Sequence, residues 1–151
     1  MDDGNTVVVD NSTLTADAGD AFRLQDTVSA TITVSNVNNT IHAGSGNLIN
    51  SIGSTATFSI ENSTLTGNIV ADSASTLDVN LLGNSTLTGV IGGAHNLFID
   101  PSTWIMPNDS SITGNLALAG NLIINSAAKF AATGQASVLT IGGTFTMRHW
   151  A

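Results

Sequence analysis

The sequence predicts an all-β protein: a right-handed parallel β-helix (solenoid) of about seven coils that ends in a C-terminal capping module. Two observations lead to this prediction, namely short strand patterns along the whole chain and their repetition at intervals of 22 to 26 residues. No segment of ten or more residues has the apolar spacing of three and four that a helix needs. With 151 residues, the chain is long enough for one domain with a real core.

Each expected strand is a pair of apolar residues with one residue between them. Asn, Gly, Ser or Asp residues, which favour turns, bound each pair. Because side chains alternate between the two faces of a strand, such a pair buries one face and leaves the other to solvent. In chain order the pairs are Val7/Val9, Ile32/Val34, Phe58/Ile60, Leu77/Val79, Leu97/Ile99, Leu116/Leu118, Leu122/Ile124, Leu139/Ile141 and Phe145/Met147.

The string Asn-Ser-Thr-Leu-Thr is the clearest internal repeat. It occurs at residues 11–15, 62–66 and 84–88, and a degenerate copy stands at 109–113. The last three copies are each followed by glycine and lie 22 and 25 residues apart. A period in this range, with several short strands in each repeat, is typical of stacked parallel coils.

A second match supports the same stacking, because residues 30–36 resemble residues 56–62 at an offset of 26. Both matches place one copy of a strand directly above the previous copy. The alignment of the repeats therefore predicts that Leu65, Leu87 and Ile112 stack inside successive coils.

The composition suits such a stack. Only 9% of the residues are charged, whereas Asn, Ser and Thr together supply 52 of the 151. In a parallel stack each side chain lies about 4.8 Å from its counterpart in the next coil, so a repeated charge would meet its own sign. Asn tolerates a left-handed turn and can bond its amide to the Asn above it. Asn62 and Asn84 are predicted to form such a ladder.

The texture of the sequence changes near residue 100. Residues 1–100 are expected to form regular coils, and residues 101–151 the C-terminal capping coils of the same solenoid. Both prolines, Pro101 and Pro107, cluster there with Trp104. An uncapped end exposes unpaired hydrogen-bonding groups of its strands, so a terminal module that covers the last coil is expected.

Charge and composition exclude several classes of partner. Three basic residues, Arg23, Lys129 and Arg148, face eleven acidic ones, for a formal net charge of -8. No surface that neutralises phosphates can be built from them, which excludes nucleic acid and docking on anionic lipid. There is no cysteine for disulfides or thiolate metal sites. No apolar run is long enough for membrane insertion, and the first residues lack a secretory signal, so an exported protein would be longer than this chain.

The C-terminal third resembles a known family. It contains a strand pattern around Trp104, the run Asp109-Ser110-Ser111-Ile112-Thr113-Gly114-Asn115-Leu116-Ala117-Leu118, then Phe130, and finally Leu139-Thr140-Ile141 followed by Gly143-Thr144-Phe145-Thr146-Met147. In this order, these motifs resemble the C-terminal end of pertactin-like autotransporter passenger domains. The chain departs from the family pattern where residues 139–141 run directly into residues 142–145 without a further turn.

The resemblance implies a passenger of type V secretion. Such a protein is exported through the periplasm, passes through its own outer-membrane β-barrel, which lies outside this chain, and folds on the bacterial cell surface. The resemblance also implies that the C-terminal coils act as an autochaperone region.

No catalytic, cofactor-binding or metal-binding residue is assigned from the sequence. His42, His95 and His149 lie about fifty residues apart and have no acidic residues at ligand spacing. A serine hydrolase would need a nucleophile elbow, and the nearest string, Gly-Ser-Gly at residues 44–46, has the wrong spacing and predicts a turn.

Polysaccharide lyases and hydrolases use the same kind of solenoid, but they need a calcium-binding carboxylate cluster with a basic residue, or carboxylates paired across a site. With Arg23 the only basic residue in the first 128, a solvated acidic edge is the expected outcome. The carboxylates considered are the local group Asp17, Asp20 and Asp26, and a pair expected on neighbouring strands, Asp72 and Asp78.

Two further patterns are interpreted as products of the repeat. Paired Thr-x-Thr positions are typical of ice-binding solenoids, but ice binding needs strict spacing, and 22 followed by 25 is not strict. The β-propensity of Thr on a solvent face accounts for the same residues. Five Asn-x-Ser/Thr sequons follow from the Asn-Ser-Thr turn, at Asn11, Asn38, Asn62, Asn84 and Asn108.

The leading hypothesis is a structural and adhesive protein, not an enzyme: a rigid β-helical stalk and folding nucleus that supports self-association or adhesion. Its expected partners are sister passengers or host and surface glycans, and no cofactor is expected. The alternatives are a fragment of a solenoid polysaccharide-active enzyme, and a passive scaffold whose binding or catalytic module lies upstream. Large apolar residues are concentrated between Trp104 and Met147, so stability is expected to be greater toward the C-terminal end.

Overall fold

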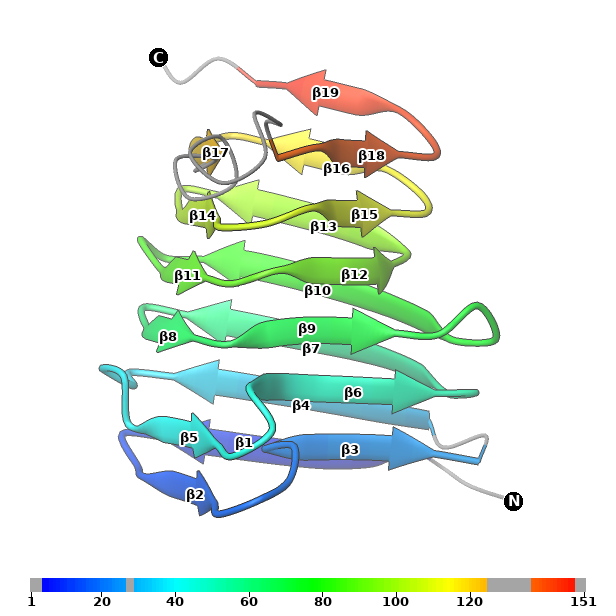
Figure 1. Ribbon diagram of the computed structural model, residues 1–151. Helices are drawn as coiled ribbons and strands as arrows, with labels where there is room; N and C mark the ends of the chain where they lie inside the picture. Colours follow the sequence, from blue (N-terminus) through cyan, green and yellow to red (C-terminus); the bar gives the residue numbers. More distant parts are fainter. Residues whose placement is uncertain (1–3, 27–28, 125–136, 149–151) are drawn as a thin grey trace.

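The computed structural model describes residues 4–26, 29–124 and 137–148, and all the regular structure in these residues is β-strand. The chain forms a parallel solenoid (Figure 1). In Figure 1 it crosses the front of the rod from left to right and returns behind from right to left as it rises, which is a right-handed coil. The predicted fold class is confirmed.

Three stacks of parallel strands make up the rod. The first sheet contains β1 (Asn5–Asp10), β4 (Ser29–Ser35), β7 (Thr55–Glu61), β10 (Thr76–Leu82), β13 (Asn96–Asp100), β16 (Leu116–Leu118) and β19 (Phe145–Met147). The second is divided into a pair, β2 (Leu14–Ala16) and β5 (Ile41–Ala43), and a group of four, β8 (Thr64–Thr66), β11 (Thr86–Thr88), β14 (Thr103–Met106) and β17 (Asn121–Ile124). The third contains β3 (Phe22–Gln25), β6 (Asn47–Ile52), β9 (Asn68–Ala71), β12 (Ile91–Ala94), β15 (Ser110–Ile112) and β18 (Leu139–Ile141).

One coil takes one strand from each sheet in turn. Five coils, from β1 to β15, are described with all their strands, and a sixth is divided by residues 125–136, which lie outside the described residues. β19 alone starts a seventh coil, so the solenoid has slightly fewer complete coils than the seven predicted. The coils become shorter along the chain, because the expected period assumed a constant length. The first sheet runs across residue 100 without a break, so both expected segments belong to one solenoid.

Apolar side chains form continuous columns inside the rod. Residues 30–35 of β4 and 56–61 of β7 pair in register, as their sequence match predicts. Each inward position is therefore stacked on the same position of the next coil, and the interior members are buried. Two columns run through the whole first sheet: Val7, Ile32, Phe58, Val79, Leu97, Leu116 and Phe145, and beside it Val9, Val34, Ile60, Leu81, Ile99, Leu118 and Met147.

The predicted stack of Leu65, Leu87 and Ile112 is half correct. Leu65 of β8 and Leu87 of β11 are register partners in the second sheet. The next member is Trp104 of β14, which is fully buried and donates its indole N–H to the Gly89 carbonyl at 2.9 Å. Ile112 lies on β15 in the third sheet, so its place in the repeat alignment is wrong. The fifth coil is shorter than the fourth, which moves the degenerate copy of the repeat onto another face.

Glycine follows two of the repeats because the turns out of β8 and β11 stack closely. A Cβ atom on Gly89 would overlap the carbonyl group of Gly67 in the coil below. Gly114, which follows the degenerate copy, lies against the carbonyl of His95 instead and so belongs to a different corner.

Candidate functional site

Each of the first four coils turns sharply after its strand in the first sheet, and an asparagine makes that turn. Asn11, Asn36, Asn62 and Asn84 have positive φ angles of 46°, 54°, 46° and 61°. Asn adopts this left-handed conformation more readily than most residues because its short polar side chain can bond locally. In the fifth coil Pro101 takes the corner, and its carbonyl accepts a hydrogen bond from the Asn84 N–H at 2.6 Å.

Amide side chains connect these corners on the outside of the rod. Asn62 Nδ2 donates to Asn36 Oδ1 at 2.8 Å, and Asn36 Nδ2 donates to Asp10 Oδ1 at 2.8 Å. The bond from Asn36, followed by one from the Ser35 hydroxyl, lowers the pKa of the Asp10 carboxyl. The predicted ladder is thus confirmed in part. Asn84 shares the backbone conformation, but the amide bonds run from Asn62 toward Asp10, and the Asn84 side chain has no hydrogen bond within the described residues.

A second ladder, of buried serines, runs inside the same corner. The Ser63, Ser85 and Ser102 side chains accept hydrogen bonds from backbone N–H groups of the preceding coil, with N···O distances of 3.0, 3.1 and 3.0 Å. The donors are Val37, Ser63 and Ser85. Backbone groups at a corner cannot pair as they do in a sheet, so the hydroxyls satisfy donors that burial would otherwise leave unpaired. Sequence reasoning missed this ladder, although the constant Ser after the corner Asn was a usable signal.

Three hollows of about 210, 330 and 140 Å³ lie along this corner. Asn36 and Asn38 line both the first and the second, and Asn84 lines both the second and the third, so the hollows form one continuous groove. We call it the corner groove, and its principal residues are Asn11, Thr13, Asn36, Asn38, Asn62, Thr64, Asn84, Thr86, Thr103 and Asn121.

The chemistry of the corner groove is neutral and polar. None of the described residues that line the three hollows is charged. Amide and hydroxyl groups are both donors and acceptors, so they can bind the hydroxyls of a neutral glycan or the polar edge of another rod. They do not titrate near neutral pH, so the groove contains no general acid or base.

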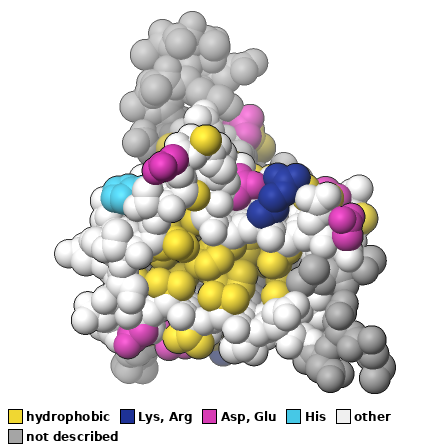
Figure 2. Space-filling view, turned by 90° about the horizontal axis from the view of Figure 1, so that it is seen from below, with side chains coloured by type: hydrophobic (Ala, Val, Ile, Leu, Met, Phe, Trp, Pro, Cys, Tyr) yellow, Lys and Arg dark blue, Asp and Glu magenta, His cyan; other side chains and the backbone are white. Residues whose placement is uncertain are grey.

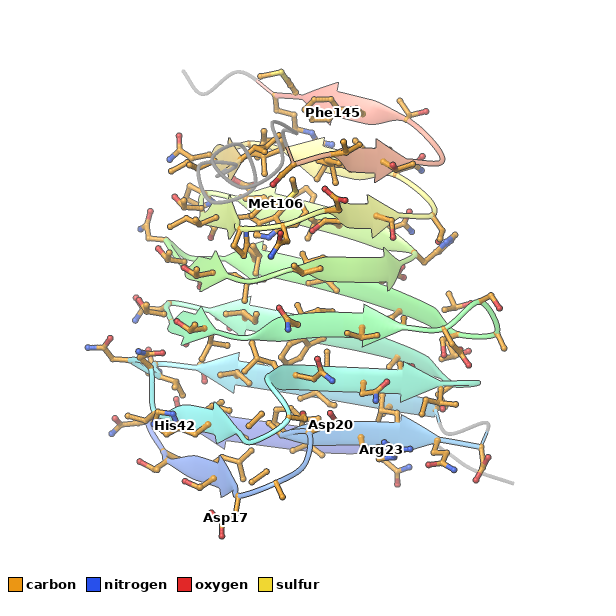
Figure 3. The ribbon with its side chains drawn as sticks, viewed as in Figure 1. Asp17, Asp20, Arg23, His42, Met106 and Phe145 are labelled. Atoms are coloured by element: carbon orange, nitrogen blue, oxygen red, sulfur yellow. The ribbon has the colours of Figure 1, made fainter. Side chains whose placement is uncertain are left out.

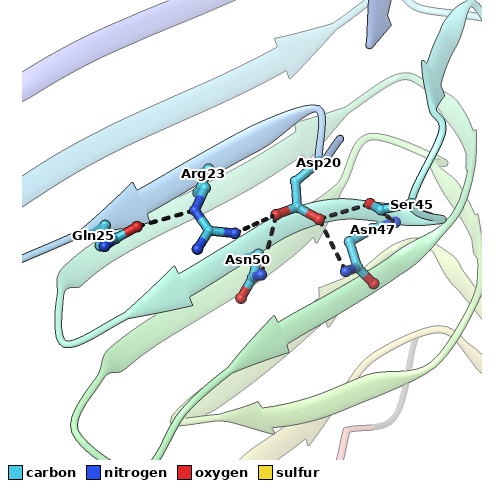
Figure 4. A network of polar contacts seen from close by, with 6 residues as sticks. All are labelled: Asp20, Arg23, Gln25, Ser45, Asn47 and Asn50. Carbon is cyan, nitrogen blue, oxygen red and sulfur yellow. Dashed lines mark hydrogen bonds and ion pairs between the residues drawn. The ribbon is translucent and has the colours of Figure 1, made fainter. Parts of the chain in front are cut away.

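The acidic group near the N-terminal end is not a cluster of carboxylates. Asp20, whose side chain is 6% exposed, accepts hydrogen bonds from Ser45, Asn47 and Asn50 and forms an ion pair with Arg23 at 3.3 Å (Figure 4). The bond from Ser45 is the largest cause of the lowered pKa of Asp20. Four donors leave this carboxylate no free lone pair to bind calcium or to accept a proton from a substrate.

The other members of that acidic group lie apart from Asp20. In Figure 3 the side chain of Asp17 points away from Asp20 and Arg23, beyond the lower end of the rod. Asp26 lies at the end of β3 with a positive φ of 64°. The three carboxylates therefore do not converge as a calcium site of a lyase requires.

Asp72 and Asp78 are also separated, and their expected placement on neighbouring strands is wrong. Asp72 follows β9 of the third sheet and accepts hydrogen bonds from the Gly53 N–H and the Ser75 hydroxyl, which lower its pKa in that order. Asp78 lies on β10 of the first sheet, where its Oδ1 atom is buried without a hydrogen-bond partner among the described residues. The two do not form the carboxylate pair of a glycosidase.

The histidines and the Gly-Ser-Gly string form no reactive constellation. His42 is exposed on β5, His95 lies between β12 and β13, and His149 is outside the described residues. Residues 44–45 form a turn, as predicted, and the Ser45 hydroxyl donates to Asp20 at 2.7 Å. Over residues 4–26, 29–124 and 137–148, no three His, Asp or Glu side chains are placed to hold one metal ion.

Comparison of the chain with family models, with curated proteins and with solved structures found no match. In the part of the chain that the structure describes, no helix is long and apolar enough to cross a membrane. The candidate site therefore rests on the geometry of the corner groove.

Proposed function

We propose that this chain is a rigid stalk within the passenger of a pertactin-like autotransporter, with an adhesive role on the bacterial cell surface. The observation that carries the proposal is the uninterrupted stack of parallel coils from β1 to β19. The segment that resembles the end of such passengers contributes β14, β15, β16, β18 and β19, while Phe130 lies outside the described residues. Its coils are a suitable folding nucleus, because each coil can template the next.

The adhesive role is assigned to the corner groove. It extends over successive coils and presents similar Asn and Thr side chains in each of them. A partner rod, or a neutral surface glycan, would make many weak hydrogen bonds in parallel, each worth about 1 kcal/mol. Since the groove is uncharged, such binding depends only weakly on salt.

The test uses the full chain displayed on a Gram-negative cell behind an export signal and in front of an autotransporter barrel. Replacing Asn62 and Asn84 together by Gly removes the two amides and keeps the left-handed backbone. We expect the double variant to be displayed and folded but to aggregate cells less than the parent does. The matched control is Asn39→Gly, since Asn39 has a positive φ of 56° and does not line the groove.

Two results would contradict the proposal. If the parent neither aggregates cells nor binds an array of neutral glycans, the adhesive role is wrong and a passive stalk remains. If the purified chain cleaves a polysaccharide, with the products detected as new reducing or unsaturated ends, the chain is a solenoid enzyme.

A further inference from the structure

The two ends of the rod expose the ends of its core columns. In the column that runs from Val7 to Phe145, the five interior members are at most 1% exposed, but Val7 is 39% and Phe145 46% exposed. Met147, which ends the neighbouring column, is 73% exposed. Each of these side chains points into the column and lacks only the next coil.

The N-terminal end is a flat apolar surface with a polar rim. Figure 2, seen from below, shows apolar side chains gathered at the centre of this end and acidic side chains at its edge. Besides Val7, the partly buried Val9, Leu14 and Phe22 belong to the first coil and pack against the core above them.

The backbone is equally unpaired at the ends. β1 pairs only with β4, and β19 pairs only with β16, so the outer edge of each has free N–H and C=O groups. Such edges accept a further parallel strand. The contact each end lacks is the coil-on-coil contact that the rod makes throughout its length.

The charges of the two ends are complementary. The first coil contains four Asp residues, Asp10, Asp17, Asp20 and Asp26, against Arg23. The described residues from 110 onward contain Arg148 and no acidic residue. The N-terminal end is therefore negative and the C-terminal end positive, which favours contact between unlike ends and opposes contact between two N-terminal ends.

We propose that the C-terminal end of one copy of this chain binds the N-terminal end of a second copy, so that the core columns and the first sheet continue across the junction. Phe145 and Met147 would stack on Val7 and Val9 as each column member stacks on the next within the rod. Because this contact joins two different surfaces, it does not close after two copies and produces rods that lengthen with concentration. It differs from the lateral contact through the corner groove, since neither end residue lines that groove.

The experiment is sedimentation of the full chain and of variants that block one end. Val7→Asp blocks the N-terminal end and Met147→Asp the C-terminal end. The matched controls are Val8→Asp and Thr146→Asp, which place the same charge on the outer face of the same strands. We expect the parent and both controls to form species that grow with concentration, and each end-blocked variant alone to remain monomeric.

The decisive sample is an equimolar mixture of Val7→Asp and Met147→Asp. It has one open end of each kind, so we expect it to form dimers and nothing larger. A monomeric parent at millimolar concentration overturns the proposal, and so does association that both end-blocked variants retain. Self-association of only one of them indicates pairing of like ends and also overturns it. If circular dichroism shows that an Asp variant is unfolded, Val7→Thr and Met147→Gln replace the pair, with the same pattern expected at higher concentration.

Discussion

The buried serine ladder gives the sharpest stability prediction. In Ser85→Ala the hydroxyl that accepts the Ser63 N–H at 3.1 Å is lost, and this buried donor has no other partner. The Leu82 carbonyl loses its 2.6 Å bond from the same hydroxyl but keeps one from the Asn62 N–H. An unpaired buried N–H costs roughly 1–3 kcal/mol, so we expect the free energy of unfolding to fall by about 2 kcal/mol.

The assay is urea or thermal unfolding of the full chain, in which about 2 kcal/mol corresponds to a decrease in midpoint of roughly 4–8 °C. Ser12→Ala is the matched control, because Ser12 follows the corner Asn of the first coil and is exposed. We expect it to change stability by no more than about 0.5 kcal/mol. Equal losses in the two variants would refute the argument that the inner hydroxyls satisfy buried backbone donors.

Three further predictions follow from single positions. Gly89→Ala should destabilise the chain by about 3 kcal/mol or more, because its Cβ would overlap the carbonyl of Gly67, whereas Gly19→Ala, with open space around it, should be nearly neutral in the same unfolding assay. Asp78→Asn should raise the unfolding midpoint, because the carboxylate has a buried oxygen without a donor, and an unchanged or lower midpoint would contradict this. The lowered pKa of Asp20 stabilises the fold above the usual value of about 3.8, and this contribution disappears as the pH falls from there through the folded-state pKa, so Asp20→Asn should flatten the acid limb of a plot of stability against pH.

The sequence predicted the solenoid because strand pairs and repeats follow from the fold itself. The offset of 26 between residues 30–36 and 56–62 is the coil length, and the strands pair in that register. The place of Ile112 could not be predicted from the repeat, because the coil length changes where Pro101 replaces the corner Asn. Motif similarity does not record such a change, but the stacking of Trp104 on Leu87 does.

The candidate site was less predictable. The ladder of corner amides was expected, but its direction toward Asp10 depends on which side chains face each other across coils. The corner groove is a property of several successive turns and has no local sequence signal. The acidic group at residues 17–26 is close in sequence yet does not converge, because Asp20 turns toward donors of the second coil.

The expected gain in stability toward the C-terminal end depends on burial. Trp104 and Leu116 are buried, but Phe145 and Met147 at the end of the same segment are exposed. Most of the large, fully buried side chains, such as Phe58 and Leu87, lie in the second to fifth coils. We therefore expect amide hydrogen exchange to be slowest in β7, β10 and β13 rather than in the last coil.

The central claim, that coils stack in one register along the whole rod, is tested most directly by engineered disulfides, because the chain has no cysteine of its own. Thr86 on β11 and Thr103 on β14 are register partners in the second sheet, whereas the repeat alignment pairs Thr86 with Ser111. Neighbouring parallel strands bring Cα atoms within the range of about 4.4–6.8 Å that a disulfide needs. We predict that Thr86→Cys with Thr103→Cys oxidises readily to an intramolecular disulfide, seen as the loss of two hydrogens by mass spectrometry. Rapid oxidation of Thr86→Cys with Ser111→Cys, and none of the first pair, would contradict the register.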